Sequence, residues 1–137
     1  MALPEHLRRG ARGEQLAARF LRDRGFQIVG ANFLTKVGET DIIALSADHI
    51  LCFVEVKTRA PGGMFPPADA VDREKQERLI SNALTFAKHS KEDFERIRFD
   101  IAEVVLHDLL HADINLIENA FGQEYHAKWR KRKEPER

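Results

Sequence analysis

The chain has 137 residues, and its 22 lysines and arginines balance its 22 aspartates and glutamates. A chain of this length usually forms one domain, and its zero net charge excludes a general electrostatic attraction to nucleic acid, so such binding needs local basic patches. The single cysteine, Cys52, excludes an internal disulfide, and no apolar stretch is long enough to span a membrane. We therefore expect a cytoplasmic protein that does not bind membranes.

The first half of the chain reads as one helix followed by three strands. Apolar residues at helical spacing predict a helix from Gly10 to Arg24, and Gly25 is a typical residue to end it. Phe26–Val29 has the composition of a short strand. Ile42–Leu45 and Ile50–Val56 read as two strands of a hairpin, joined by a tight turn.

The second half reads as a loop, a helix and two strands. Ala60–Pro67 is rich in glycine and proline, which is typical of a loop. Asp72 to Lys88 reads as a helix with an aspartate N-cap, and Phe99–Leu106 and Ala112–Ile117 read as strands. This order of elements favours an α/β fold in which helices flank a sheet.

The composition changes near the C-terminus. Residues 1–121 are expected to form the single domain, and residues 122–137 a basic tail. Lys128–Arg137 alone carries six basic and two acidic residues. A frayed, solvated tail and an electrostatic arm for phosphate groups both explain this excess of positive charge.

Two carboxylates and a lysine stand on apolar, strand-like runs. Glu55 and Lys57 are two positions apart, so they point to the same face of their strand. If Ser46 pairs with Ile50 across the hairpin, Asp41 falls opposite Glu55, and the two like charges repel. Mg²⁺ between the carboxylates would remove that repulsion, and Lys57 would stabilise negative charge beside it. The alternative is a surface hairpin on which Glu55 and Lys57 form an ordinary ion pair.

Three further polar residues border this constellation. Glu14 lies along the apolar stripe of the first helix, and Gln76 is in line with the apolar stripe of the second. Each is either a site residue or a boundary residue with a local partner. Glu39 shares a strand face with Asp41, so it is either an accessory ligand or a solvent-facing carboxylate.

A series of short motifs then occurs in order along the chain. They are Gly10-Ala-Arg-Gly-Glu14-Gln-Leu-Ala, Ala31-Asn-Phe33, Gly38-Glu-Thr-Asp41-Ile-Ile-Ala, Phe53-Val-Glu55-Val-Lys57-Thr-Arg59, Ala70-Val71 with Lys75-Gln76, Phe99-Asp100 and Asn119-Ala-Phe121. From about Arg9 to Phe121 the chain resembles the YraN family of small bacterial proteins, whose role is largely unassigned. Thr40 departs from the family, which usually has an aliphatic residue there, and we expect this only to loosen the packing of the strand.

The resemblance implies a fold and a set of site residues. The YraN family resembles the restriction-endonuclease-like fold, a mixed sheet of about five strands flanked by helices, whose signature is an aspartate followed by Glu-x-Lys. It is also similar to archaeal Holliday-junction resolvases, which add a glutamate from the first helix. The roles that this resemblance implies are metal ligation by Asp41 and Glu55, catalysis by Lys57, assistance by Glu14 and Gln76, and contact with the phosphate backbone by Thr58 and Arg59.

The expected function is a metal-dependent endonuclease that uses Mg²⁺ or Mn²⁺ to hydrolyse phosphodiester bonds in nucleic acid, with DNA, including branched DNA, as the first candidate. Basic surface for the substrate would come from the arginines of the first helix, Arg12 among them. The alternative is a nucleic-acid-binding or adaptor protein that does not cleave, and a third hypothesis is a structural partner without a nucleic-acid role. A homodimer is expected only by analogy with resolvases.

Overall fold

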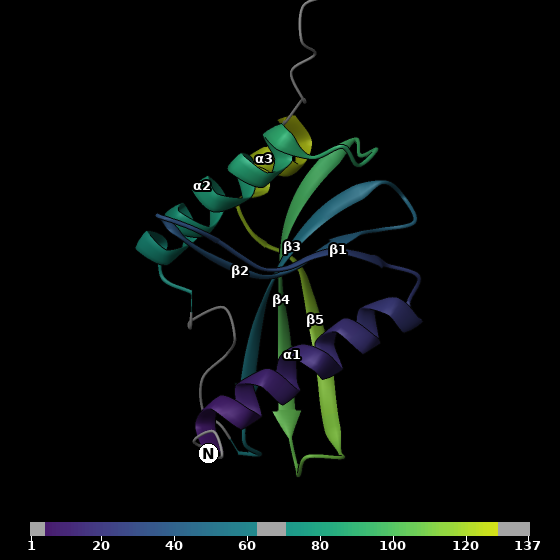
Figure 1. Ribbon diagram of the computed structural model, residues 1–137, viewed down its shortest axis with the longest axis vertical. Helices are drawn as coiled ribbons and strands as arrows, with labels where there is room; N and C mark the ends of the chain where they lie inside the picture. The colour runs from purple at the N-terminus through teal and green to yellow at the C-terminus, as the bar shows by residue number, and fades with distance from the viewer. Residues whose placement is uncertain (1–4, 63–70, 129–137) are drawn as a thin grey trace, which may run out of the picture.

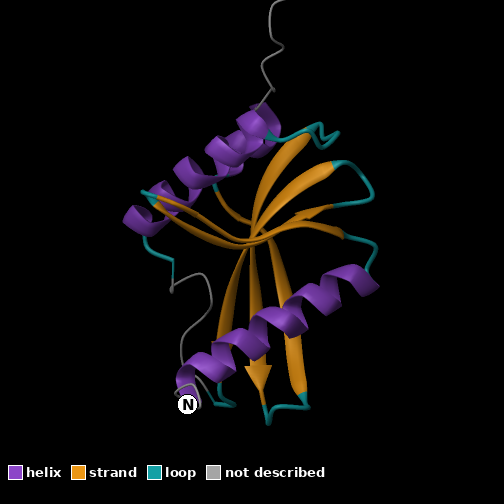
Figure 2. Ribbon diagram, viewed as in Figure 1, coloured by secondary structure: helices purple, strands orange, loops and turns teal. Residues whose placement is uncertain are grey.

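One five-stranded sheet, in the spatial order β1-β2-β3-β4-β5, organises the molecule in this computed structural model, which describes residues 5–62 and 71–128. Figure 1 and Figure 2 show two long helices packed on opposite sides of the sheet. The elements are α1 (Glu5–Asp23), β1 (Gln27–Thr35), β2 (Gly38–Leu45), β3 (Ile50–Arg59), α2 (Arg73–His89), β4 (Arg96–Leu106), β5 (Ala112–Phe121) and α3 (Gln123–Lys128).

The sheet is mixed, because three neighbouring pairs are antiparallel and the central pair is parallel. β1 with β2, β2 with β3, and β4 with β5 run antiparallel. β3 and β4 run parallel, and α2 lies in the connection between them. A parallel pair needs such a crossover, because a tight turn cannot return the chain to the same end of the sheet. The expected α/β fold, with a five-stranded mixed sheet and flanking helices, is confirmed.

The alternation of side chains along the strands divides the core between the two helices. Ala17 and Leu21 of α1 pack against one face of the sheet, which includes Ile42 and Val54. Leu79, Ala83 and Ala87 of α2 pack against the opposite face, with a group of phenylalanines. Rings of that group contact one another in edge or stacked pairs, among them Phe33, Phe53, Phe86, Phe99 and Phe121. Within the described ranges, no helix has the length and apolar character needed to cross a membrane.

A buried asparagine attaches α2 to the hairpin formed by β1 and β2. The Asn82 side chain donates to the Phe33 carbonyl at 3.0 Å and to Thr40 Oγ1 at 2.9 Å, and it accepts from Thr35 Oγ1 at 2.6 Å. Thr40 therefore does more than loosen the strand, because its hydroxyl is a partner that an aliphatic side chain could not offer to the buried amide.

The structure extends several elements beyond their sequence-based limits. α1 begins at Glu5, and β1 continues to Thr35 through a register shift between Ile28 and Gly30. Part of the expected C-terminal tail is packed, because Tyr125 of α3 contacts the ring of Phe99 with centroids 6.4 Å apart. The rest of that tail, residues 129–137, and most of the expected loop, residues 63–67, lie outside the described residues.

The close crossing of α1 over β3 depends on a glycine. A Cβ atom added at Gly13 would collide with the side chain of Thr58, whereas one added at Gly10 would meet nothing within 4 Å. Alanine stabilises a helix by about 1 kcal/mol relative to glycine, but overpacking a tight contact costs about 1 to 3 kcal/mol. We expect Gly13→Ala to lower the free energy of unfolding and Gly10→Ala to raise it, as measured by urea denaturation. Equal effects of the two substitutions would show that α1 does not press on β3 at Gly13.

Candidate active site

The site begins where β2 and β3 separate. Their ladder pairs Leu45 with Leu51 and Ile42 with Val54, and the Ser46 amide donates to the Ile50 carbonyl at 2.9 Å. Of the registers open to the hairpin, this is the one that places Asp41 opposite Glu55. Beyond Ile42 the two strands part.

Beyond Ile42, a hydrogen bond from the Asp41 side chain takes the place of the backbone hydrogen bonds between β2 and β3. Asp41 Oδ2 accepts a hydrogen bond from the backbone amide of Val56 at 2.8 Å. The Asp41 carboxyl group therefore sits between the two strands and bridges to β3. Its neighbour across the gap is the carboxyl group of Glu55, whose negative charge acts on the Asp41 carboxyl group.

Glu55 is a buried carboxylate that two lysines share. Glu55 is only 7% exposed. Its Oε1 lies 3.0 Å from Lys75 Nζ and 3.4 Å from Lys57 Nζ. Lys57 comes from the same strand, two positions on, and Lys75 comes from the first part of α2. Two cations compensate the cost of removing one carboxylate from water. The Glu55–Lys57 ion pair therefore exists, but it is largely buried rather than on an open surface.

The charges in this cluster shift the acidity of its members. Burial raises the pKa of the Asp41 carboxyl group to about 7, with a further contribution from the negative charge of Glu55. Burial also lowers the pKa of Lys57, and a hydrogen bond with Lys75 adds to that effect. Asp41 is thus close to half protonated at neutral pH when no cation lies beside it.

Glu14 approaches the same cluster from α1. Its pKa is raised, first by burial and next by the charge of Glu39, and Glu55 adds to the shift. With the Asn32 side-chain amide turned so that its nitrogen faces the two glutamates, that nitrogen donates to Glu14 Oε2 at 3.2 Å and to Glu39 Oε1 at 3.0 Å. Glu39 therefore shares a hydrogen-bonding partner with Glu14.

Asn32 holds this position through an unusual backbone conformation. It has a φ of 50°, a left-handed value that asparagine tolerates better than most residues. Asn32 belongs to the motif Ala31-Asn-Phe33, which by itself indicates no role for the asparagine. An asparagine inside a strand was the available signal, because asparagine is depleted in regular strands.

Gln76 and Lys75 are neighbours on α2 with different surroundings. The Gln76 side-chain amide donates to the Val71 carbonyl at 2.9 Å, which is a local bond at the start of the helix. Lys75 reaches Glu55, and the sequence analysis gave it no role. Lys75 stands four positions before Leu79 on the apolar stripe and Gln76 stands three positions before it, so the spacing alone does not decide which of the two faces the sheet.

The residues expected to contact the phosphate backbone separate into two places. Thr58 and Arg59 line a hollow of about 400 Å³ together with Glu14 and Arg9. Arg12 lies elsewhere on α1, where its Nε donates to the Leu109 carbonyl at 2.8 Å. The structure thus brings Thr58 and Arg59 beside Glu14, whereas the Arg12 guanidinium group is attached to the turn between β4 and β5.

Comparison with known proteins identifies the family of this chain. A model of the uncharacterised protein family UPF0102 matches residues 13–104. The chain belongs to UPF0102. This confirms the resemblance to the YraN family, because the two names describe the same family. The matched residues include Glu14, Asp41, Glu55, Lys57 and Lys75.

Relatives in UPF0102 cover nearly the whole chain. A UPF0102 protein of Alkaliphilus oremlandii is 43% identical over 114 residues, which is 82% of this chain and 96% of the relative. One from Rhodococcus opacus is 36% identical over 87% of this chain and 100% of its own length. One from Pelobacter propionicus is 38% identical over 90% of this chain and 89% of its own length.

The donor atoms of this UPF0102 site fit an open metal site better than a closed one. Among residues 5–62 and 71–128, no group of three or more histidine, cysteine, aspartate or glutamate side chains could hold a metal ion. Mg²⁺ is usually bound by one or two carboxylates together with water and substrate phosphate oxygens. Asp41 and Glu55 would be such a pair, and Lys75 Nζ lies 3.0 Å from Glu55 Oε1.

Proposed function

We propose that this UPF0102 protein is a metal-dependent endonuclease that hydrolyses phosphodiester bonds in nucleic acid, with DNA as the expected substrate. The observation that carries the proposal is the meeting of Asp41 and Glu55, from two separating strands, beside Lys57 and Lys75. A protein that only needs a stable sheet gains nothing from a buried carboxylate whose pKa is raised to about 7 by burial and a neighbouring carboxylate.

Each group at the site suits a step of phosphodiester hydrolysis. Asp41 and Glu55 would hold Mg²⁺ or Mn²⁺, which when bound lowers the pKa of a water molecule and offsets negative charge on the phosphate. Lys57 and Lys75 present two positive charges where the phosphate oxygens gain negative charge in the transition state. Glu14 has a raised pKa and a fixed orientation from Asn32, which suits it to position a water and accept its proton.

One observation favours a second candidate, a nucleic-acid-binding protein on the same fold that does not cleave. The short contact between Lys75 and Glu55 already neutralises one of the two carboxylates without a metal ion. A binding protein could keep that ion pair as a permanent structural contact.

The test is cleavage of a labelled panel of duplex, single-stranded, flapped and four-way-junction DNA, together with RNA. Each substrate is incubated with Mg²⁺, Mn²⁺ or EDTA, and the wild type is compared with Lys57→Ala. We expect cleavage that requires the metal and falls by about a hundredfold in Lys57→Ala, the scale of losing one charge-stabilising group.

Lys88→Ala is the matched control, because Lys88 is an exposed lysine in the last turn of α2. It should cleave at the wild-type rate. Binding without cleavage under every metal condition would favour the second candidate. Cleavage that survives Lys57→Ala at full rate would point to a contaminating nuclease.

A further inference from the structure

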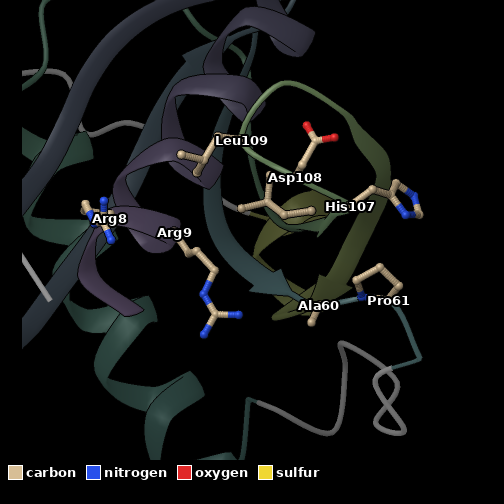
Figure 3. Close-up of a pocket in the computed structure, with 8 residues that line it drawn as sticks. Arg8, Arg9, Ala60, Pro61, His107, Asp108 and Leu109 are labelled. Carbon is tan, nitrogen blue, oxygen red and sulfur yellow. The ribbon is translucent and has the colours of Figure 1, made fainter. Parts of the chain in front are cut away.

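A second hollow lies at the end of β3, beyond the candidate site. It has a volume of about 260 Å³, and Figure 3 shows the residues that line it. Arg8 and Arg9 come from the start of α1, Ala60 and Pro61 follow β3, and Leu106 and Leu109 come from the end of β4 and the turn after it. Three segments that are distant in the sequence therefore form one concave surface.

Four of the eight residues that line this hollow are apolar, namely Ala60, Pro61, Leu106 and Leu109. Leu106 is buried, whereas the apolar side chain of Leu109 is 50% exposed to solvent. Two polar side chains of the turn, Asp108 and His107, have hydrogen-bonding partners outside the hollow. The Asp108 carboxylate accepts from the backbone amides of Leu110 and His111, and His107 Nε2 lies 2.7 Å from Asp113. In Figure 3 both Asp108 and His107 point away from Arg9.

The mouth of the hollow is positively charged and its wall is held in place. Among residues 5–62 and 71–128, neither Arg8 nor Arg9 forms an ion pair with a carboxylate. Their charges are therefore available to an anion. Arg12, in contrast, uses its Nε to bind the Leu109 carbonyl and so fixes the wall against α1.

The hollow adjoins the one that Glu14 lines. Both are lined by Arg9 and Ala60, and the hollow nearer the site is also lined by Val56, whose amide binds Asp41. From Val56 to Arg59 the strand rises by about 10 Å. A strand of duplex DNA advances about 3.4 Å per nucleotide, so the second hollow lies within a few nucleotides of the candidate site.

We propose that this hollow binds an unpaired nucleobase a few nucleotides from the cleaved phosphate, while Arg9 binds a phosphate between the two hollows. The inference rests on the proposed nuclease function and defines its substrate class as nucleic acid that is single-stranded near the cleavage point. A paired base is stacked inside its duplex and cannot enter this hollow, whereas an unpaired base enters at little cost. A guanidinium group binds phosphate through two hydrogen bonds or stacks on a base plane.

The test measures binding rather than cleavage. Fluorescence anisotropy in EDTA compares a labelled single-stranded oligonucleotide with the corresponding blunt duplex. We expect the wild type to bind the single strand about tenfold more tightly, the scale of one seated base. Leu109→Glu and Arg9→Gln should remove this preference, because they place a carboxylate in the hollow or remove the charge at its mouth.

Two exposed residues of the same kinds provide matched controls. Leu110→Glu alters a leucine that is 78% exposed and does not line the hollow, and Arg96→Gln alters an exposed arginine at the start of β4. Both should keep the wild-type preference. Melting temperatures establish that all four variants are folded, and Arg9→Gln tests the proposal independently if Leu109→Glu is unstable.

Equal binding of duplex and single strand by the wild type would overturn the proposal. Equal effects of Leu109→Glu and Leu110→Glu on this preference would also overturn it. So would displacement of the oligonucleotide by polyglutamate at the same concentration of charge, because that result would indicate a site for acidic peptides. If the preference depends on Leu109 and Arg9 but metal produces no cleavage, the nuclease function fails and the base-binding hollow stands.

Discussion

Glu55→Ala is expected to reduce metal-dependent cleavage by at least about a hundredfold. Replacing residues that merely support metal ligands already costs about 10- to 100-fold in affinity or activity, and Glu55 is proposed as a ligand itself. The substitution also removes the group that holds Lys57 and Lys75 together. Single-turnover cleavage of a labelled oligonucleotide, in Mg²⁺ and separately in Mn²⁺, measures the loss.

The same substitution should weaken the fold to a smaller degree. It leaves two neighbouring lysines without their shared carboxylate, which costs about 1 kcal/mol because the Lys57 and Lys75 side chains keep 21% and 36% exposure to water. Glu77→Gln is the control, since Glu77 is an exposed glutamate of α2 with only a surface partner, Arg73. A Glu55→Ala protein that cleaves at the wild-type rate would remove Glu55 from the site.

Asp41→Asn is expected to stabilise the metal-free protein by about 1 to 3 kcal/mol at pH 8. The pKa of Asp41 is raised to about 7 by burial and by Glu55, whereas an unfolded aspartate has a pKa of about 3.9. As the pH rises, the Asp41 carboxyl group therefore loses its proton at a lower pH in the unfolded chain than in the folded protein. The free energy of unfolding should fall as the pH rises from about 4 to about 7 and stay at the lower value above that range. Asparagine removes the buried charge and keeps an oxygen for the Val56 amide.

Urea denaturation at pH 5 and pH 8, in EDTA and in excess Mg²⁺ or Mn²⁺, measures this effect. The advantage of Asp41→Asn should shrink at pH 5, where the wild-type carboxyl group is protonated. Addition of the cation should stabilise the wild type by up to about 3 kcal/mol at a hundredfold excess over the dissociation constant, but not Asp41→Asn. Asp48→Asn, in the exposed turn of the hairpin, should respond like the wild type. A cation that stabilises Asp41→Asn equally would argue against Asp41 as a ligand.

The parts of the site that follow from local structure were predictable from the sequence in part. Asp41 falls opposite Glu55 once Ser46 pairs with Ile50, and the sequence left that register open because a slip of one residue turns every side chain to the other face. Glu55 and Lys57 share a face because strand side chains alternate. Each of these inferences needs only residues that are close together in the chain.

The contacts that depend on docking were not predictable in the same way. Whether Lys75 or Gln76 faces Glu55 depends on a rotation of about 100° about the axis of α2, and the packing of the helix against the sheet decides it. The continuation of β1 past Gly30 was missed because a bulge accommodates residues that are poor strand formers. The helix α3 was missed because the basic character of the C-terminal residues hid the signal of Tyr125, whose ring packs on Phe99.

The parallel pairing of β3 with β4 has a consequence for the ribosome-bound chain. The hairpin that carries Asp41 and Glu55 can form as soon as its own residues are synthesised, but Lys75 is positioned only when α2 packs on the sheet. That packing surface includes Ile97 and Phe99 of β4, which are synthesised later. Because non-local pairing forms slowly, the cluster is completed near the end of folding. A nascent chain therefore carries Asp41 and Glu55 on a formed hairpin before Lys75 is positioned beside Glu55.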